Sequence, residues 1–379
     1  MEKITNFQLH CLLILLTLPI AVIEQPHRLI HIVYNNAWLT FIPVFFTGTL
    51  LILMYTQIIN KSSQPFPLLL DEHLGKTLGR ILGSAYIFIF ILTCSFNLRV
   101  FIEFMKMIVL PATPISIFIG VILFVGFIAI KLGLGSIART SEILVWIGLT
   151  FSAAIILIPL MDHFHLERLR PIAYMNYISF GQGVFIATLI LGKMMPILSL
   201  AFFIPDKKRA AAIMYRVLFT YAPFLAFTTL AVIVTLGTYP ARNFVFPTFN
   251  MIRLARIGVF IQNLDIVFVA VWILGVFGAV TISWWMACFT TQKVFNLQDY
   301  RFLAAPSSVI IGILSLILSR NNLEVLVWSL SIMPYIFAVF FILIPFFIFI
   351  ICLFKDAPDI SAPEPANSPE PLHKQGVAG

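Results

Sequence analysis

Long apolar segments recur along the whole chain and limit it to one broad class of fold. A membrane-spanning helix needs about 20 predominantly apolar residues. Ten segments meet this requirement, at approximately 7–30, 38–59, 81–109, 114–131, 141–161, 184–204, 214–237, 264–290, 303–319 and 326–354. We therefore expect an all-α polytopic membrane protein with ten transmembrane helices.

The composition agrees with a membrane protein. Hydrophobic residues make up 60% of the chain and charged residues only 11%, whereas a soluble domain carries about 25% charged residues. The water-soluble classes of protein are therefore excluded. The formal net charge of +8 does not indicate nucleic-acid binding, because the basic residues lie in short loops and form no tract.

Side chains that bind metals or carry out catalysis form no recognisable pattern. The cysteines lie singly in apolar segments, at Cys11, Cys94, Cys288 and Cys352, which argues against a disulfide framework and against a zinc site. No glycine-rich phosphate loop or nucleophile triad occurs. We expect no metal, no cofactor and no enzymatic activity.

The distribution of lysine and arginine predicts the orientation in the membrane, since cytoplasmic loops carry an excess of basic residues. With ten spans, one side receives Lys3, Lys61, Lys76, Arg80, Lys131, Arg139, Lys207, Lys208, Arg209, Arg216, Lys293, Arg301, Lys355 and Lys374. The other side receives Arg28, Arg168, Arg170, Arg242, Arg253, Arg256 and Arg320. Both termini are therefore expected in the cytoplasm.

Two spans contain signals for a break near their middle. In the first span, two prolines bracket Glu24, in the segment from Leu18 to Pro26 that also contains Ala21 and Gln25. In the sixth span, Gly192 and Lys193 are followed closely by Pro196. Proline removes a backbone donor and clashes with the preceding turn, and an ionisable residue at this depth is a site hypothesis. We expect both helices to be interrupted there.

The positions of these two spans suggest how they meet. Transporters are often built from inverted repeats whose broken helices form a binding site at the middle of the membrane. Two repeats of five helices, at about 7–161 and 184–354, make the first and sixth spans equivalent. Glu24 and Lys193 have opposite charge, so we expect them to pair across a ligand pocket lined also by Ala21, Gln25 and Gly192.

Two further spans carry polar residues. In the third, Arg99, Glu103 and Lys106 are spaced to share one helix face. They either form a self-neutralising structural pair, or Arg99 lines the pocket. In the eighth, Thr281 and Ser283 either bond helix to helix, which is the usual role of hydroxyls in spans, or line the pocket opposite the first break.

Three connecting or terminal segments complete the prediction. The connection from Asp162 to Gly183 is long enough to cover a pocket on the outer side. The segment from Pro247 to Arg256 is amphipathic, which predicts a short helix at the membrane interface or, as the alternative, a surface that docks a partner. Residues 356–379 repeat proline with little apolar content, so we expect a disordered cytoplasmic tail.

Short motifs spread over the chain resemble one family. They are Asn36-Ala-Trp38, Leu98-Arg99, Leu110 to Pro114, Ala138 to Glu142, Arg170-Pro171, Pro205 to Arg209, Pro247 to Arg253, and Trp272. In their order and spacing they resemble the B subunits of bacterial spore germinant receptors (the GerAB type), within the amino acid–polyamine–organocation transporter superfamily. The resemblance extends to about Phe354.

This resemblance implies a leucine-transporter-like fold of five-plus-five inverted repeats with broken helices 1 and 6. It also implies residence in the inner membrane of the spore and assembly with A-type and C-type receptor subunits. The small-molecule germinant, often an amino acid, would bind at the two breaks. Two alternatives stay open at this point: an ion-coupled secondary amino-acid transporter, and a membrane scaffold with a vestigial pocket.

Overall fold

The computed structural model describes residues 3–174, 176–255, 264–319 and 322–354, and these ranges contain helices and no β-strand. The main helices are α1 (Asn6–Val33), α2 (Phe41–Lys61), α3 (Phe66–Leu74), α4 (Lys76–Phe104), α5 (Ile115–Leu132), α6 (Leu134–Asp162), α7 (Tyr177–Leu191), α8 (Ile197–Leu200), α9 (Ala210–Leu236), α10 (Thr238–Asn243), α11 (Pro247–Ile252), α12 (Leu264–Val294) and α13 (Ala304–Ile317). The last span runs from Asn322 to Phe354 as α14 (Asn322–Val327), the π-helix η8 (Trp328–Ile332), α15 (Met333–Phe337), the π-helix η9 (Ala338–Leu343) and α16 (Ile344–Phe354).

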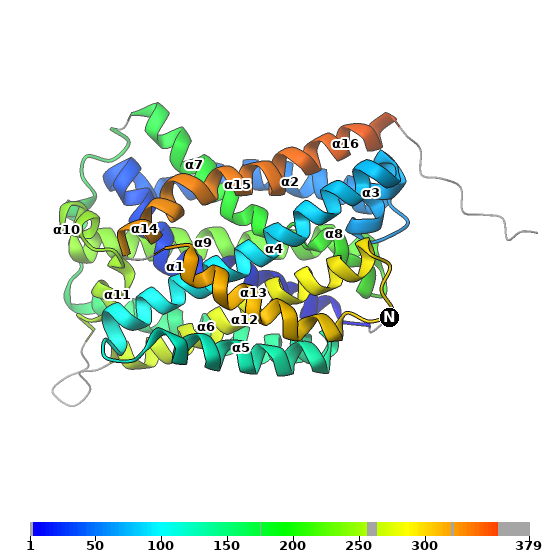
Figure 1. Cartoon of the computed structure of the whole chain (residues 1–379). Coiled ribbons are helices and arrows are strands. Elements are labelled where there is room, and N and C mark those ends of the chain that lie inside the picture. Colours follow the sequence, from blue (N-terminus) through cyan, green and yellow to red (C-terminus); the bar gives the residue numbers. More distant parts are fainter. Residues whose placement is uncertain (1–2, 175, 256–263, 320–321, 355–379) are drawn as a thin grey trace, which may run out of the picture.

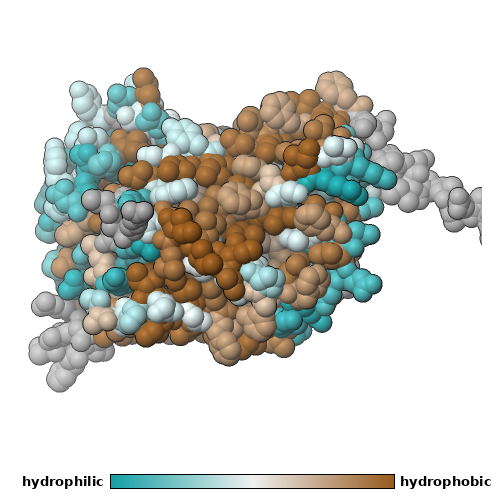
Figure 2. Space-filling view, in the orientation of Figure 1, coloured by the Kyte–Doolittle hydropathy of each residue, from teal (hydrophilic) through white to brown (hydrophobic). Residues whose placement is uncertain are grey.

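The long helices confirm an all-α polytopic membrane protein. In the described part of the chain, eight helical segments are long and apolar enough to cross a membrane. The first of them, Asn6–Lys61, holds both α1 and α2, and Arg301–Ile317 is a shorter apolar helix. Figure 2 shows apolar residues across the middle of the visible face and polar residues toward both ends. The count of ten spans stays a prediction.

Helix α1 lies at the centre of the bundle. It contacts α6, α7, α9 and α12, and most of its residues are buried. A helix that is apolar on nearly all sides has to be surrounded by other helices or lipid, which explains this position. The N-terminus lies at the same end of the molecule as α3 and α8, whereas α10 and α11 lie at the opposite end (Figure 1).

The predicted break in the first span is wrong, because α1 is one continuous α-helix from Asn6 to Val33 with both prolines inside it. Pro26 lacks the N–H that would bond to the carbonyl of Val22, four residues earlier. The hydroxyl of Thr248 donates to that carbonyl instead, at 2.8 Å. Neighbouring side chains that bond to freed carbonyls in this way let proline remain inside a membrane helix.

Replacing Thr248 by valine keeps the shape of the side chain and removes this donor. The Val22 carbonyl is then buried without its partner, so the free energy of unfolding is expected to fall by about 1 kcal/mol. Thermal unfolding of the purified protein in detergent measures the change. Thr248→Ser retains the hydroxyl and serves as the control. If valine and serine behave alike, the bond does not compensate for Pro26.

The predicted break in the sixth span is confirmed. Helix α7 ends at Leu191, the 3-10 turn η4 (Gly192–Met194) follows, and α8 begins only after Pro196. The last span carries two further irregular stretches, the π-helices η8 and η9. The sequence analysis did not predict these.

The short helix predicted at the membrane interface is present as α11, but it is buried within the protein. Phe249 and Ile252 are buried, and α11 packs against α1, α6, α9 and α12. Its apolar face is therefore covered by protein. Arg256 and residues 356–379 lie outside the described residues, and the division into two inverted repeats stays a prediction.

Candidate functional site

Three side chains form a buried charged cluster between α1 and the last span. Arg28 Nη2 donates to Glu24 Oε2 at 2.7 Å, and the hydroxyl of Ser329 donates to Glu24 Oε1 at 2.9 Å. Arg28 also donates to Ser329. The side chain of Arg28 is 2% exposed and that of Glu24 10%. We call Glu24, Arg28 and Ser329 the charged cluster.

Two members of the charged cluster were missed by the sequence analysis. Arg28 was assigned to an outer loop, which is wrong, because it lies inside α1. Its spacing of four residues from Glu24 could have indicated an ion pair on one helix face. Ser329 lies 305 residues from Glu24 in the sequence, and no local pattern could have connected them.

Lys193 lies in the turn η4, at the confirmed break, and is 5% exposed. Its Nζ lies 5.0 Å from the centre of the Phe337 ring in the last span, where a cation is attracted to the ring face. The turn η4 contacts α1, the helix that carries Glu24 and Arg28. The structure thus brings Glu24 and Lys193 into one region, but the ion-pair partner of Glu24 is Arg28.

Helix α4 contributes a second buried ion pair. Arg99 donates to Glu103 four residues later, as the spacing predicts. Lys106 is exposed in the π-turn η2 (Met105–Val109). The wider turn changes the helix register after Phe104, so Lys106 leaves the face that Arg99 and Glu103 share. The pair therefore contains one cation.

A small cavity connects the two ion pairs. It has a volume of about 20 Å³ and is lined by Glu24, Arg28, Glu103 and Ser329, together with His27 and five apolar residues. His27 is held in place because its Nδ1 donates to the carbonyl of Phe244 at 2.8 Å. Charged groups from α1 and α4 and the hydroxyl of Ser329 in the last span thus border one space.

Several buried polar atoms of α1 and α4 have no hydrogen-bond partner among the described residues. They include both amide atoms of Gln25, which is 0% exposed, Nε and Nη1 of Arg28, and Nε of Arg99. A buried polar group without a hydrogen bond costs about 1–3 kcal/mol. Such groups are suited to bind a polar ligand or water.

The other predicted site residues lie in different surroundings. Ala21 is buried on α1, and Gly192 lies against the last span, since a Cβ placed on it would be 3.4 Å from Phe341 Cβ. Thr281 lines another cavity, between α5, α6 and α12, of about 200 Å³. Ser283 donates to the carbonyl of Ala279 in its own helix. The structure does not bring the two hydroxyls to the charged cluster.

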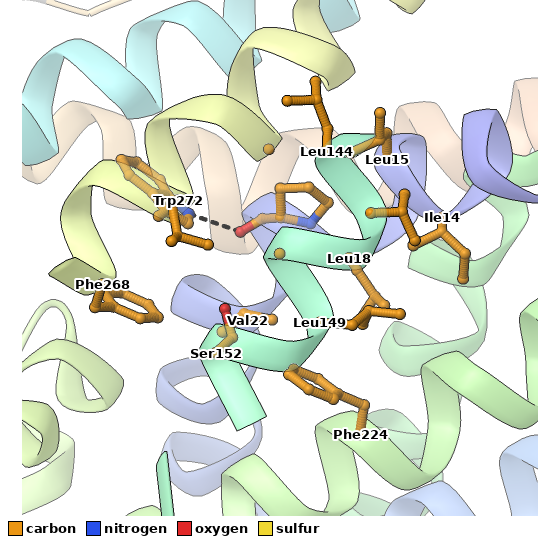
Figure 3. A pocket seen from close by; sticks show the side chains of 15 residues that line it. Ile14, Leu15, Leu18, Val22, Leu144, Leu149, Ser152, Phe224, Phe268 and Trp272 are labelled. Atoms are coloured by element: carbon orange, nitrogen blue, oxygen red, sulfur yellow. Dashed lines mark hydrogen bonds between the residues drawn. The ribbon is translucent and has the colours of Figure 1, made fainter. Parts of the chain in front are cut away.

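Another cavity lies between α1, α6, α9 and α12 (Figure 3). Its lining is mostly apolar and includes Leu18, Val22, Phe224 and Phe268. Trp272 Nε1 donates to the carbonyl of Pro19 at 2.7 Å, so this carbonyl is already bonded. The cavity measures about 50 Å³. Small-molecule pockets measure about 300–1,000 Å³, so neither cavity beside α1 holds a ligand in this conformation.

Larger clefts occur at the end of the molecule where α10 lies. One of about 750 Å³ is lined by Tyr34, Asn36, Arg170, Tyr174 and Tyr239, among others. Asn36 fixes the loop that contributes Arg170 and Tyr174, because it accepts from the Ala173 N–H at 2.9 Å and donates to the Tyr174 carbonyl at 3.1 Å. The predicted covering connection therefore forms a wall of this cleft.

Apolar spans around a broken helix, with buried charges beside the break, define a polytopic membrane protein of the permease type. The family model described as spore germination protein matches residues 3–323, and the chain belongs to this family. The resemblance inferred from the sequence motifs is thereby confirmed.

Curated relatives from Bacillus subtilis (strain 168) match over most of their length. Spore germination protein A2 is 27% identical over 360 residues, which are 90% of this chain and 91% of that protein. Spore germination protein KB is 24% identical over 329 residues, 85% of this chain and 87% of that protein. Spore germination protein YndE is 25% identical over 329 residues, with 83% and 86% covered.

Proposed function

We propose that this protein is the membrane subunit of a spore germinant receptor and that it binds a small germinant of the amino-acid class beside the break that follows α7. The observation that carries the proposal is the gathering of Glu24, Arg28 and Lys193 in a buried region with unpaired polar atoms. Charges inside a membrane protein are costly and usually mark a ligand or ion site.

The chemistry of the charges fits a zwitterion. Lys193 Nζ and the unpaired Nη1 of Arg28 offer donors to a carboxylate. Glu24 offers acceptor oxygens to an ammonium group, and the carbonyl of Gly192 lies at the adjoining break. A ligand with both groups balances both sets of charges, whereas a simple anion or cation balances only one.

The proposed binding requires a change of shape. The cavity at the charged cluster measures about 20 Å³, which is room for at most one water. The described conformation is therefore the closed, ligand-free one. Binding would separate α1, α7 and the last span, and this movement would signal to partner subunits of the A and C types.

The proposed location is the inner membrane of the spore, with both termini in the cytoplasm. The end of the molecule that carries the N-terminus supports this orientation. There, the Ile4 N–H bonds to the carbonyl of Phe203, and Lys207 Nζ donates to the carbonyl of Ser62. Lys61, Lys76 and Lys207 flank these contacts, as the excess of basic residues on the cytoplasmic side predicts.

Replacing Lys193 by methionine tests the proposal. The variant keeps a long side chain against Phe337 but loses the charge, so binding of the amino acid is expected to weaken by 100-fold or more, by about 3 kcal/mol. A panel of the L-amino acids is screened by thermal shift with the purified protein, and germination of spores is measured in parallel. Lys106→Met is the matched control, because Lys106 is exposed in a spanning segment.

The results separate the alternatives. Normal binding and normal germination in the Lys193→Met spores would contradict the proposed pocket. The interruption of the sixth span after α7 also fits an ion-coupled secondary amino-acid transporter. Uptake of the same amino acid by liposomes that contain only this protein would favour the transporter, and a flat uptake trace would count against it.

A further inference from the structure

The last span connects the proposed site to one end of the molecule. Ser329 belongs to the charged cluster, and the ring of Phe337 lies against Lys193. Near its C-terminal end, Cys352 Sγ lies 3.6 Å from Nε2 of His73 in α3. Helix α3 lies at the end where the N-terminus lies (Figure 1). One helical segment thus runs from the buried charges to the surface proposed to be cytoplasmic.

The Tyr55 hydroxyl lies between the last span and the turn η4 that follows α7. Pro196 and Pro345 each lack the N–H that would bond to a carbonyl four residues earlier. These carbonyls belong to Gly192, which accepts the Met195 N–H at 2.9 Å instead, and to Phe341. The hydroxyl of Tyr55 in α2 donates to the Phe341 carbonyl, and the Gly192 carbonyl lies 3.5 Å from the same hydroxyl. Because the hydroxyl has one proton, it can bond strongly to only one of them.

A second tyrosine bonds to the adjacent residue of the π-helix η9. The hydroxyl of Tyr86 donates to the carbonyl of Phe340 at 2.6 Å. Phe340 precedes Pro345 by five residues, so this is the carbonyl that a π-helical bond from residue 345 would use. The two tyrosines therefore bond to the two carbonyls, four and five residues before Pro345, that residue 345 would use in an α-helix or in a π-helix. Both tyrosine side chains are fully buried.

The last span is also able to move at a small cost in packing free energy. It is among the least buried of the candidate membrane spans, so a shift removes few packing contacts. Its two π-helices, η8 and η9, lie at the residues that contact the charged cluster and the tyrosines. Such π-helical turns occur frequently at functional sites.

We propose that Tyr55 and Tyr86 are positioning residues that hold the last span in the ligand-free conformation. Binding of the germinant at Lys193 moves the turn η4. The Tyr55 hydroxyl then loses its bond to the Phe341 carbonyl, and the last span shifts against α3. The Gly192 carbonyl offers this hydroxyl only a weaker bond, because it already accepts the Met195 N–H. This inference rests on the proposed germinant site and names the last span as the element that transmits ligand binding.

Removing one hydroxyl at a time tests this relay. Tyr55→Phe and Tyr86→Phe weaken the ligand-free conformation, so the amino-acid concentration for half-maximal germination is expected to fall by about 2- to 10-fold. If the two hydroxyls only stabilise the fold, the variants accumulate less protein and need a higher amino-acid concentration for half-maximal germination. Tyr221→Phe is the matched control, because its buried hydroxyl bonds to the Ala187 carbonyl in α7 and not to the last span. Equal shifts in all three variants, or a rise in concentration, would overturn the relay.

A cross-link provides a second test that does not depend on these hydroxyls. In a His73→Cys variant, a membrane-permeant oxidant can join residue 73 to the native Cys352, and a reductant reverses the bond. The oxidised spores are expected to lose germination by at least 10-fold and to recover it on reduction. Normal germination of fully cross-linked spores would overturn the relay alone. Failure of the reduced wild-type protein to bind any amino acid would overturn the proposed site and the relay together.

Discussion

Replacing Arg28 by methionine is expected to lower the free energy of unfolding by about 3–5 kcal/mol, the largest effect of any single substitution considered for this protein. Arg28 is the ion-pair partner of Glu24; the Arg28 side chain is buried and that of Glu24 is only 10% exposed. Methionine fills much of the same space but leaves the carboxylate without its cation. Leaving one charge without its partner lowers the free energy of unfolding by more than the intact pair raises it.

A double variant shows whether the unpaired charge is the cause. Glu24→Gln together with Arg28→Met removes both charges and should recover most of the lost stability. The measurements are denaturant unfolding of the purified protein in detergent and the amount of protein in the membrane. Arg209→Met serves as control, because Arg209 is 67% exposed and its contact with Asp206 is 3.9 Å long, a pair worth about 0–1 kcal/mol. Wild-type stability of the Arg28 variant would contradict the buried pair.

Gly79→Ala is expected to be the second most damaging change. A Cβ at this position of α4 would lie 2.6 Å from the backbone nitrogen of Asp71 and 2.7 Å from its Cα. These are atoms of the α3 backbone, so no side-chain rotation relieves the contact, and α3 has to move away from α4. Overpacking of this kind costs about 1–3 kcal/mol, and occasionally more.

Gly120→Ala is the matched control for this substitution. Gly120 lies in the membrane helix α5, and a Cβ there meets nothing within 4 Å. Alanine at position 120 should leave stability unchanged or raise it slightly, because it favours the helix. Thermal unfolding in detergent compares the two variants. Equal stability of both would mean that α3 and α4 are less closely packed than described.

Much of the fold could be predicted from local patterns. Apolar segments of about 20 residues predict membrane helices wherever they occur, and the broken sixth span followed from Gly192 and Pro196. The pairing of Arg99 with Glu103 followed from their spacing along one helix. The family followed from the order and spacing of short motifs. Each of these depends on residues that are near one another in the sequence.

The first span shows why local patterns were insufficient elsewhere. Pro19 and Pro26 suggested a break, but the helix continues because Thr248 supplies the donor that Pro26 removes. That donor comes from α11, 226 residues farther along the chain. Arg28 was likewise placed outside the membrane because its charge was counted before its neighbours were known.

The charged site required the same long-range information. The sequence by itself determined the helices, the membrane and the presence of Glu24 and Lys193 inside it, because these follow from hydrophobicity and from charges within single segments. Only the tertiary structure decided that Glu24 pairs with Arg28, that Lys193 packs on Phe337, and that Tyr55 joins two spans. Hydrogen bonds and ion pairs act over a few ångströms, so they depend on which helices pack side by side.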